Sequence, residues 1–537
     1  MKPAEMLLPP TSSPLTSGPS DHVSSFVIRS ISEGLKAGMP PFSSLRTRRH
    51  FFFSLLLLGL LSVTGCQVDR SQPGPPRAGT IPCVIDGQFQ EWIQDPPAPP
   101  LTARTDGRTL WIQLRLGTPP VSLQNLAEPW ILDITYDDPS ANAQRIVFSP
   151  AEAGYGVGAF EIDQGRERPH SPYDIHFQFA PTVAAARFEM SLRMPVSGSG
   201  TLALRPGADM APMVTDFQAP ATPPPPVTHA DWPADATGDV LRVVSWNVLF
   251  GNLIHERERA GKILAALDPD ILLLQELEDE QDPREIADML NATLGSEPAP
   301  WIVVASPVGS RLRSMAAARG GVHLPAAGTI ARLDDSTRFL RAAVLGVPTE
   351  YGTLIVASVH LRCCGGPGDE ADLQRMAEAL SLGHAIDGIV NEMEARQRQL
   401  QRSLEQPMPA ASGIGVAGMI IGGDLNLVGS TSPLTILAEN RAAFGGRGGS
   451  TTLIAADPLH LDGSSNATWS DKEKSFTPGR LDYLLYSPST LAMRNAFLLD
   501  TARVDPGALQ LRALFSGDTA AVSDHAPLVL DLTLRGE

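Results

Sequence analysis

Apolar stretches in the second half of the chain end at, or begin just after, polar residues of types common in catalytic sites. Six stretches carry them in order: 241–247 with Asn247, 271–276 with Glu276, 354–360 with His360, 419–426 with Asp424 and Asn426, 482–486 with Asp482, and 523–530 with Asp524 and His525. Continuous apolar runs of this length are typical of buried strands. A carboxylate beside such a strand is costly unless it has a partner. Because strands of one sheet can bring their ends to one rim, the pattern predicts a single site.

The pattern between residues 81 and 215 differs, because apolar and polar residues alternate there. Residues 109–116 and 130–136 both alternate, Asp-Gly pairs stand at 86–87 and 106–107, and no long helical pattern interrupts them. Alternation between turn signals predicts antiparallel strands that are buried on one face. Residues 81–215 are therefore expected to form an all-β sandwich.

The order of motifs in this predicted sandwich is I-D-G, then E-W, then a D-G pair ahead of a strand. This order resembles the family-nine-like carbohydrate-binding sandwiches of secreted bacterial proteins. The resemblance implies a glycan as partner, which would need exposed aromatic side chains such as Trp92 or Trp130. The alternative, which we favour, is that both tryptophans belong to the core.

The length of the chain, 537 residues, predicts two folded domains. The stretch A-P-A-T-P-P-P-P at 219–226 is typical of a stiff, extended spacer. We therefore expect a linker over 216–237 and a second domain over 238–537. The net charge of −17 disfavours broad electrostatic binding to nucleic acid or anionic lipid, although a local basic groove or a metal could still supply positive charge.

Residues 1–65 have the features of a targeting signal. Three arginines between residues 46 and 49 precede an apolar segment at 51–61, which is shorter than the ~20 residues of a membrane span and fits a secretory signal. The end of this segment, V-T-G-C, resembles the bacterial lipobox, whose cysteine is lipidated after cleavage. Cys66 would then be the mature N-terminus and a lipid anchor at the bacterial periplasm or cell surface, followed by a linker over 66–80. An ordinary signal peptide is the alternative, and Met39 is the start that would give it a normal length.

The remaining cysteines are Cys83, Cys363 and Cys364, an odd number without the C-x-x-C spacing of a zinc site. The adjacent pair follows His360 closely. Three interpretations stay open: a disulfide within the pair, a disulfide to Cys83, or free thiols.

The strand-end motifs together resemble the endonuclease/exonuclease/phosphatase superfamily. They are S-W-N (245–247), L-L-L-Q-E-L-E (272–278), V-H-L (359–361), G-G-D-L-N (422–426), R-L-D-Y-L-L-Y (480–486) and S-D-H-A-P-L-V-L-D-L (523–532). This superfamily contains deoxyribonucleases, abasic-site endonucleases, inositol-phosphate phosphatases and sphingomyelinases. The resemblance implies an α/β four-layer sandwich, with two mixed β-sheets packed face to face and helices outside, and Mg²⁺-dependent cleavage of a phosphoester, with Mn²⁺ as the alternative ion.

The resemblance also implies a role for each strand-end residue. Asp424 would be the general base for the attacking water, Asn426 would position water or phosphate, and His360 would donate to a phosphoryl oxygen as charge develops. Asp482 would orient His525, which would act on the phosphate as donor or acid. The expected metal ligands are Glu276, Asn247 and Asp524, and Arg362 is a candidate phosphate contact. A carboxylate such as Glu276 suits Mg²⁺, which prefers oxygen ligands.

Some positions depart from the family pattern. Leu249 stands where the abasic-site branch has an acid, which disfavours that activity. Residues 391–418 are expected to be an insertion that begins with a charged helix over 392–404.

From the signal segment and the motif resemblance together, we expect an exported, lipid-anchored phosphoesterase acting on nucleic acid, an inositol phosphate or a phospholipid headgroup. The alternative is a non-catalytic surface protein that binds glycan through the sandwich.

Overall fold

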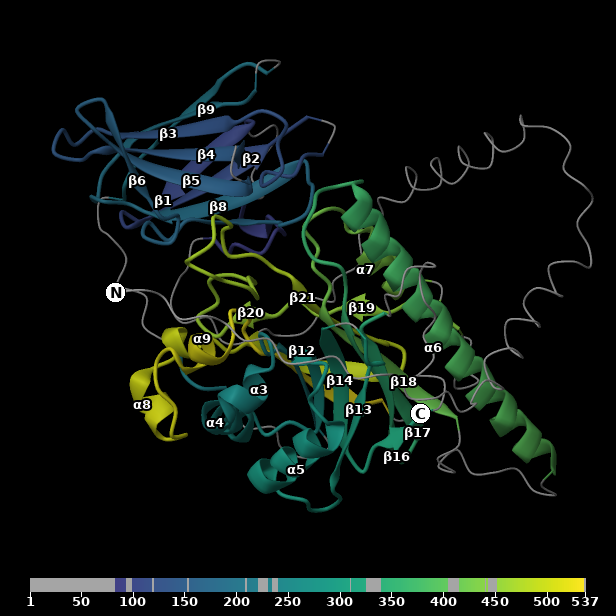
Figure 1. Ribbon diagram of the computed structural model, residues 1–537. Helices are drawn as coiled ribbons and strands as arrows, with labels where there is room; N and C mark the ends of the chain where they lie inside the picture. Colours follow the sequence, from purple (N-terminus) through teal and green to yellow (C-terminus); the bar gives the residue numbers. More distant parts are fainter. Residues whose placement is uncertain are drawn as a thin grey trace, which may run out of the picture. The chain divides into compact units, whose positions relative to one another are not determined.

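The computed structural model describes residues 83–92, 99–117, 120–151, 154–207, 210–220, 230–233, 240–309, 311–324, 340–403, 415–439, 441–442 and 452–535 (Figure 1). The predicted signal, Cys66 and the linker at 66–80 lie outside these residues, as does most of the proline-rich linker.

The N-terminal part consists of two antiparallel sheets, with strand orders β1-β2-β8-β7 and β10-β9-β3-β4-β5-β6. The strands are β1 (Leu101–Thr105), β2 (Thr109–Arg115), β3 (Trp130–Tyr136), β4 (Ala143–Ala151), β5 (Gly154–Asp163), β6 (Arg166–His170), β7 (Gln178–Ala180), β8 (Arg187–Arg193), β9 (Gly200–Arg205) and β10 (Met213–Phe217), after a short helix η1 (Gln90–Trp92). Apolar side chains of both sheets, among them Ile112 of β2 and Ile146 of β4, share one core. The predicted all-β sandwich is confirmed.

The two tryptophans considered for glycan binding are buried. Trp92 is 2% exposed and Trp130 is 6% exposed. Trp130 lies in the main core of the sandwich, and Trp92 lies in a smaller cluster with Cys83. Neither ring is available as a sugar-binding platform, in agreement with the interpretation that both belong to the core.

The C-terminal part begins with a seven-stranded mixed sheet of order β13-β14-β12-β11-β23-β22-β20. Its strands are β11 (Leu241–Asn247), β12 (Ile271–Glu278), β13 (Trp301–Ala305), β14 (Leu312–Arg319), β20 (Leu459–His460), β22 (Leu491–Leu498) and β23 (Leu528–Leu534). The neighbours β11 and β12 are parallel, whereas β11 and β23 are antiparallel.

The second sheet of this part is six-stranded, with the order β15-β16-β17-β18-β21-β19. Its strands are β15 (Val322–His323), β16 (Ala342–Thr349), β17 (Gly352–His360), β18 (Val416–Asp424), β19 (Ile454–Ala455) and β21 (Asp482–Tyr486). The strands β17 and β18 are parallel, and β21 runs antiparallel to β18. This sheet is mixed as well.

Three apolar clusters define the layers. Leu273 of β12 and Ile420 of β18 belong to the cluster between the two sheets. The outer face of the seven-stranded sheet packs on α4 and α5, and that of the six-stranded sheet on α6 and α7. The helices are α3 (Asn252–His255), α4 (Arg257–Leu267), α5 (Pro283–Leu294), α6 (Glu370–Ser403), α7 (Ser432–Ala438), η3 (Thr501–Arg503), α8 (Pro506–Gln510) and α9 (Asp518–Val522). The expected four-layer α/β sandwich is confirmed.

The helix α6 is longer than the sequence pattern suggested. It runs unbroken over 34 residues from Glu370 to Ser403, so the charged segment expected to open an insertion is the C-terminal end of one long helix (Figure 1). Its first half is anchored by residues such as Leu382 and Ile386 in the core of the six-stranded sheet. Residues 392–403 therefore continue a helix that is already packed on the sheet, and they do not begin a new one.

The sandwich and the α/β part belong to one compact unit, Cys66–Glu537. A β-bridge joins Ile85 of the N-terminal part to Ser465 of the C-terminal part. The domain boundaries proposed from the sequence stay predictions. Within the described residues, no helix is both long and apolar enough to span a membrane.

Candidate active site

Three of the predicted residues lie side by side across the six-stranded sheet. His360 at the end of β17 pairs with Asp424 at the end of parallel β18, and Asp424 pairs with Asp482 at the start of antiparallel β21. Gly423 permits this close pairing: its φ is 143°, and a Cβ there would overlap the carbonyl oxygen of Val359. The register of the sheet thus assembles residues that are far apart in the sequence.

The seven-stranded sheet supplies Asn247 and Glu276. Asn247 ends β11 opposite Gln275 of β12, and the register of β12 against β14 shifts between Leu274 and Leu277. Glu276 lies within this bulge, in the left-handed region with φ 60°. A bulge re-aims a side chain, and backbone strain of this kind concentrates at functional sites. The two sheets are joined here because Gln275 Nε2 donates to Ser358 Oγ of β17 at 2.9 Å.

Asp482 and His525 form a buried pair. Oδ2 of Asp482 lies 2.7 Å from Nδ1 of His525, within charge-assisted hydrogen-bond distance. Burial favours the neutral imidazole, but the charge and hydrogen bond of Asp482 outweigh it and raise the pKa of His525 to about 10. His525 is therefore an imidazolium at neutral pH, with Nε2 left to face the pocket.

Asp424 lies at the centre of the group. Its Oδ2 accepts a hydrogen bond from Asn247 Nδ2 at 3.1 Å, and its Oδ1 accepts one from the backbone N–H of Asn426 at 2.9 Å. Oδ2 also lies 3.9 Å from Nε2 of His525. Burial raises the pKa of Asp424 to about 8, with the imidazolium of His525 opposing this and the charges of Asp482 and Glu276 adding to it. A carboxyl with a pKa in this range suits proton transfer near neutral pH.

His360, Glu276 and Asp424 form a cluster that could hold a metal ion. Nε2 of His360 lies 3.8 Å from Glu276 Oε1 and 3.6 Å from Asp424 Oδ2, and one ligand atom from each residue lies within 4.8 Å of the others. Burial holds the pKa of His360 well below 6.5, together with the positive charges of Arg341 and His525. An imidazole and two carboxyl groups fit a divalent cation.

The remaining predicted residues divide between the site and its surroundings. Asp524 lines the same pocket: its Oδ2 accepts from Trp469 Nε1 at 2.8 Å, and its buried Oδ1 has no hydrogen-bond partner among the described residues. It is outside the three-residue cluster above. Asn426 donates through Nδ2 to the carbonyl of Leu361 at 3.2 Å. Arg362 does not line the pocket. The individual roles assigned from the sequence stay predictions.

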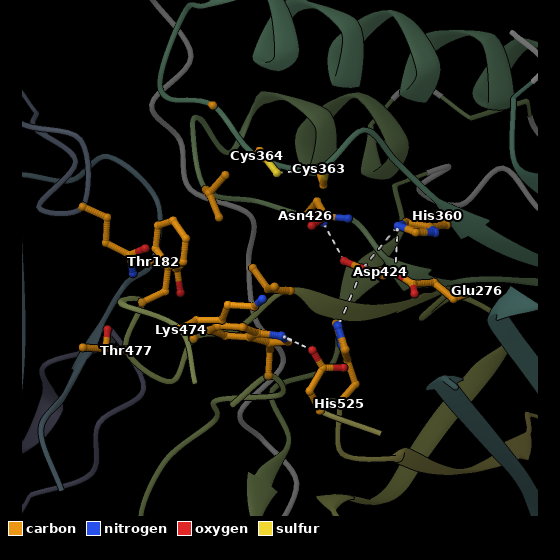
Figure 2. Close-up of a pocket in the computed structure, with 18 of the residues that line it drawn as sticks. Thr182, Glu276, His360, Cys363, Cys364, Asp424, Asn426, Lys474, Thr477 and His525 are labelled. Carbon is orange, nitrogen blue, oxygen red and sulfur yellow. Dashed lines mark hydrogen bonds and ion pairs between the residues drawn. The ribbon is translucent and has the colours of Figure 1, made fainter. Parts of the chain in front are cut away.

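A pocket of about 290 Å³ opens at the site (Figure 2). The predicted residues that line it are Glu276, His360, Asp424, Asn426, Asp524 and His525. Its lining includes residues that the sequence did not single out: Trp469, Lys474, Phe476 and Thr477 from the segment before β21, and Ser122, Gln124, Asn125 and Thr182 from the sandwich. Figure 2 shows Thr182, Lys474 and Thr477 on the opposite side of the pocket from Glu276 and His360. No local pattern marks these residues, because they reach the pocket through contacts between distant segments.

Cys363 and Cys364 also line the pocket, and both are free thiols, as is buried Cys83. Sγ of Cys364 lies 2.9 Å from Sγ of Cys363. This hydrogen bond lowers the pKa of Cys363 to about 6 and raises the pKa of Cys364. Of the three interpretations left open by the sequence, the structure has the free-thiol state.

The geometry combines a buried acid that can accept a proton, an imidazolium oriented by a second acid, and a cluster able to bind a divalent cation. This set can activate water and stabilise negative charge on a phosphoryl oxygen. The groups converge on one pocket, so a single ester could contact all of them.

Comparison with known proteins identifies a family. A model of the endonuclease/exonuclease/phosphatase family matches residues 244–525, more than half of the chain. No curated protein sequence matches the chain. Similar solved structures include the AP endonuclease LMAP from Leishmania major, with 13% identity over 56% of this chain and 89% of that chain and a TM-score of 0.31. Sphingomyelinase C from Streptomyces griseocarneus has 15% identity over 54% of this chain and 99% of that chain, with a TM-score of 0.30.

The family match covers every strand-end residue from Asn247 to His525. The two mixed sheets with outer helices are the fold that the motif resemblance implies. The chain belongs to the endonuclease/exonuclease/phosphatase family.

Proposed function

We propose that this protein is an exported, lipid-anchored and Mg²⁺-dependent phosphoesterase that hydrolyses its substrate by in-line attack of water. The observation that carries the proposal is the convergence of the Asp482–His525 pair on Asp424, whose Oδ2 lies 3.9 Å from Nε2 of His525. A purely structural ion pair would not need a third acid, also buried, facing the open end of the imidazole.

In this proposal, Asp424 accepts a proton from the attacking water. Asn247 and the backbone N–H of Asn426 fix the direction of the carboxylate through hydrogen bonds to its two oxygens. The water oxygen bonds to phosphorus, and the bond from phosphorus to the alcohol oxygen breaks. His525 donates from Nε2 to a phosphoryl oxygen or to the departing oxygen, because Asp482 keeps it protonated.

Glu276 is the proposed metal ligand, because both the sequence prediction and the three-residue cluster include it. His360 and Asp424 are the further candidates from the geometry, and Asn247 and Asp524 those from the sequence. When bound, Mg²⁺ would supply Lewis-acid polarisation of the phosphoryl group and a template for it.

The test is a substrate panel on the purified protein. Bis-p-nitrophenyl phosphate, plasmid DNA, inositol phosphates and sphingomyelin should be assayed with Mg²⁺, with Mn²⁺ and with EDTA. We expect hydrolysis of at least one ester that EDTA abolishes and that Asp424→Asn reduces at least 10²-fold, the scale of a positioned acid–base group. A folded protein without turnover on any ester would contradict the proposal and favour the non-catalytic alternative, in which the sandwich binds glycan.

Export and anchoring form a separate part of the proposal. They are supported by the arginines, the apolar segment and the V-T-G-C sequence that ends at Cys66. Cys66→Ser should release the protein from the membrane fraction or leave its signal uncleaved. A mature N-terminus at another residue without lipid, found by mass spectrometry, would contradict the anchor and leave the enzymatic proposal intact.

A further inference from the structure

We propose that the β-sandwich completes the active site, and that Asn125 and Thr182 of the sandwich, together with Lys474, form a subsite for the alcohol part of a compact, hydroxyl-bearing phosphoester. This inference rests on the proposed phosphoesterase function and names the substrate class for it. It gives the sandwich a role in specificity, in place of a separate binding role.

The first support is that the sandwich holds the segment that carries Lys474. Tyr173 Oη donates to the carbonyl of Phe476 and accepts from the backbone N–H of Asp471, both at 3.0 Å. The backbone N–H of Val157 donates to the carbonyl of Ser475 at 2.8 Å. These bonds fix the segment on both sides of Lys474, so its position depends on the sandwich.

The same segment continues into the catalytic strands. Oγ1 of Thr182 accepts from the backbone N–H of Arg480 at 3.0 Å, two residues before Asp482. A β-bridge joins Trp469 to His525, and the indole of Trp469 holds Asp524. The sandwich is therefore connected to the segment beside the catalytic pair through hydrogen bonds of the Tyr173 and Thr182 side chains and of the backbone.

The sandwich also reaches the other rim of the pocket. The side chain of Asn125 packs so closely on Gly366, in the loop after β17, that a Cβ on this glycine would overlap the amide. The backbone N–H of Ala184 donates to the carbonyl of Gly429, in the loop after β18, at 2.9 Å. A cleft that would otherwise be open on this side becomes a pocket with a wall.

Asn125, Thr182 and Lys474 carry the polar groups of this wall that line the pocket. Lys474 is exposed, and it is the one cationic side chain that the wall contributes to the lining. The negative charge of a phosphoester would match its ammonium group. The hydroxyl groups of the alcohol part would match the side-chain amide of Asn125 and the hydroxyl of Thr182.

Size and charge disfavour a nucleic-acid duplex. The volume of about 290 Å³ is at the lower limit of ordinary ligand pockets, which span ~300–1,000 Å³. Lys474 is the one lysine among the lining residues, which include no arginine, and the whole chain carries −17. Binding to duplex DNA relies on several lysines and arginines and buries about 1,000–2,500 Å² of protein surface. A polyol-sized ester fits this wall, whereas a duplex would not reach past it.

The test uses the full chain and four substrates. Glycerophosphoglycerol and glycerol 1-phosphate are a diester and a monoester of one polyol, vesicles of phosphatidylglycerol present the same headgroup on a lipid, and supercoiled plasmid is the duplex. Bis-p-nitrophenyl phosphate, with and without EDTA, reports the proposed function independently. The variants are Asn125→Ala and Lys474→Ala, with Lys474→Arg as the conservative replacement. Lys472→Ala is the matched control, because Lys472 is exposed on the same segment and does not line the pocket.

We expect kcat/KM to be at least 100-fold higher on one polyol ester, free or in vesicles, than on plasmid. Asn125→Ala and Lys474→Ala should each lower it about 10-fold on that ester, equivalent to about 1.4 kcal/mol, mainly through KM because the lost contact binds substrate and transition state alike. Lys474→Arg should recover part of the loss, and Lys472→Ala should change kcat/KM less than twofold.

Two outcomes would overturn the inference: efficient cleavage of plasmid, or kinetics of Asn125→Ala and Lys474→Ala that both match those of Lys472→Ala. In either case, EDTA-sensitive turnover of bis-p-nitrophenyl phosphate would leave the proposed function standing. Absence of that turnover would overturn both. A higher kcat/KM on the soluble esters would identify a free glycerophosphoester as the substrate, and a higher value on phosphatidylglycerol vesicles would identify a lipid headgroup.

Discussion

Replacing Asp482 by asparagine should remove the charge that keeps His525 protonated while preserving the shape of the pair. The carboxylate lies 2.7 Å from Nδ1 of His525, and both side chains are buried. Asparagine can still accept a hydrogen bond from Nδ1 through its carbonyl oxygen. The substitution therefore isolates the effect of charge.

The expected loss of kcat follows from the groups that set the pKa of His525. Burial alone would lower its pKa, and Asp482 is the main group that raises it to about 10, against an ordinary value of about 6.5. Without this charge, only the weaker influence of Asp424 and Asp524 opposes burial, so the pKa should fall to about 6.5 or below. At neutral pH most of the imidazolium would then be lost, and we expect kcat to drop about 10²-fold or more.

The pH dependence gives the sign of the effect. Because the folded-state pKa of His525 is raised, the pair contributes stability fully below pH 6.5 and loses it as pH rises through about 10. The variant should be destabilised most below pH 6.5, by about 3–5 kcal/mol, as for removal of one partner of a buried pair. The difference should shrink toward pH 10. In the variant, kcat should also decline at a lower pH than in the native protein.

The assay combines kcat from pH 5 to 10 at saturating Mg²⁺ with thermal unfolding at pH 5.5 and 9. Asp531→Asn is the matched control, because Asp531 is also buried and pairs with Arg242 at 2.7 Å away from the pocket. It should lower stability but leave the metal-saturated kcat unchanged. If Asp482→Asn instead weakens Mg²⁺ binding and leaves the saturated kcat intact, the division between the metal ligands and the partner of His525 is wrong.

Three further predictions follow from the fold and the site. Glu276→Gln should raise the Mg²⁺ concentration for half-maximal rate, with partial recovery at high metal; an unchanged metal requirement would remove Glu276 from the ligands. Gly423→Ala should destabilise the protein by more than about 2 kcal/mol, since its Cβ would overlap the carbonyl of Val359, and denaturant unfolding would measure this. Proteolysis within 219–226 should leave the two fragments associated on gel filtration, because the sandwich is bonded to the segment before β21; separation into two species would show that these contacts are weak.

The sequence by itself determined the strands of the α/β part and the residues at their ends, and the resemblance of its motifs to a known family implied the four layers. The apolar run over 241–247 coincides with β11, and those ending at His360 and Asp424 end with β17 and β18. Such runs are readable because a strand between two packed layers must be apolar on both faces, so a polar residue marks its end. The alternation in the sandwich was readable for the complementary reason, that one face of each sheet meets the core.

Tertiary structure alone decided how these residues meet. His360, Asp424 and Asp482 share one rung because of strand order and register, neither of which is encoded locally. The bulge that turns Glu276 toward the site depends on the pairing of β12 with β14.

The wall formed by the sandwich was not predictable from the proline-rich stretch, which indicated separation of the two parts. Its hydrogen bonds run between backbone groups and a few side chains such as Tyr173 and Thr182. Backbone groups are the same in every residue, so contacts of this kind leave no pattern in the sequence. They exist only once two distant surfaces fit each other, and for this protein that fit determines the shape of the pocket.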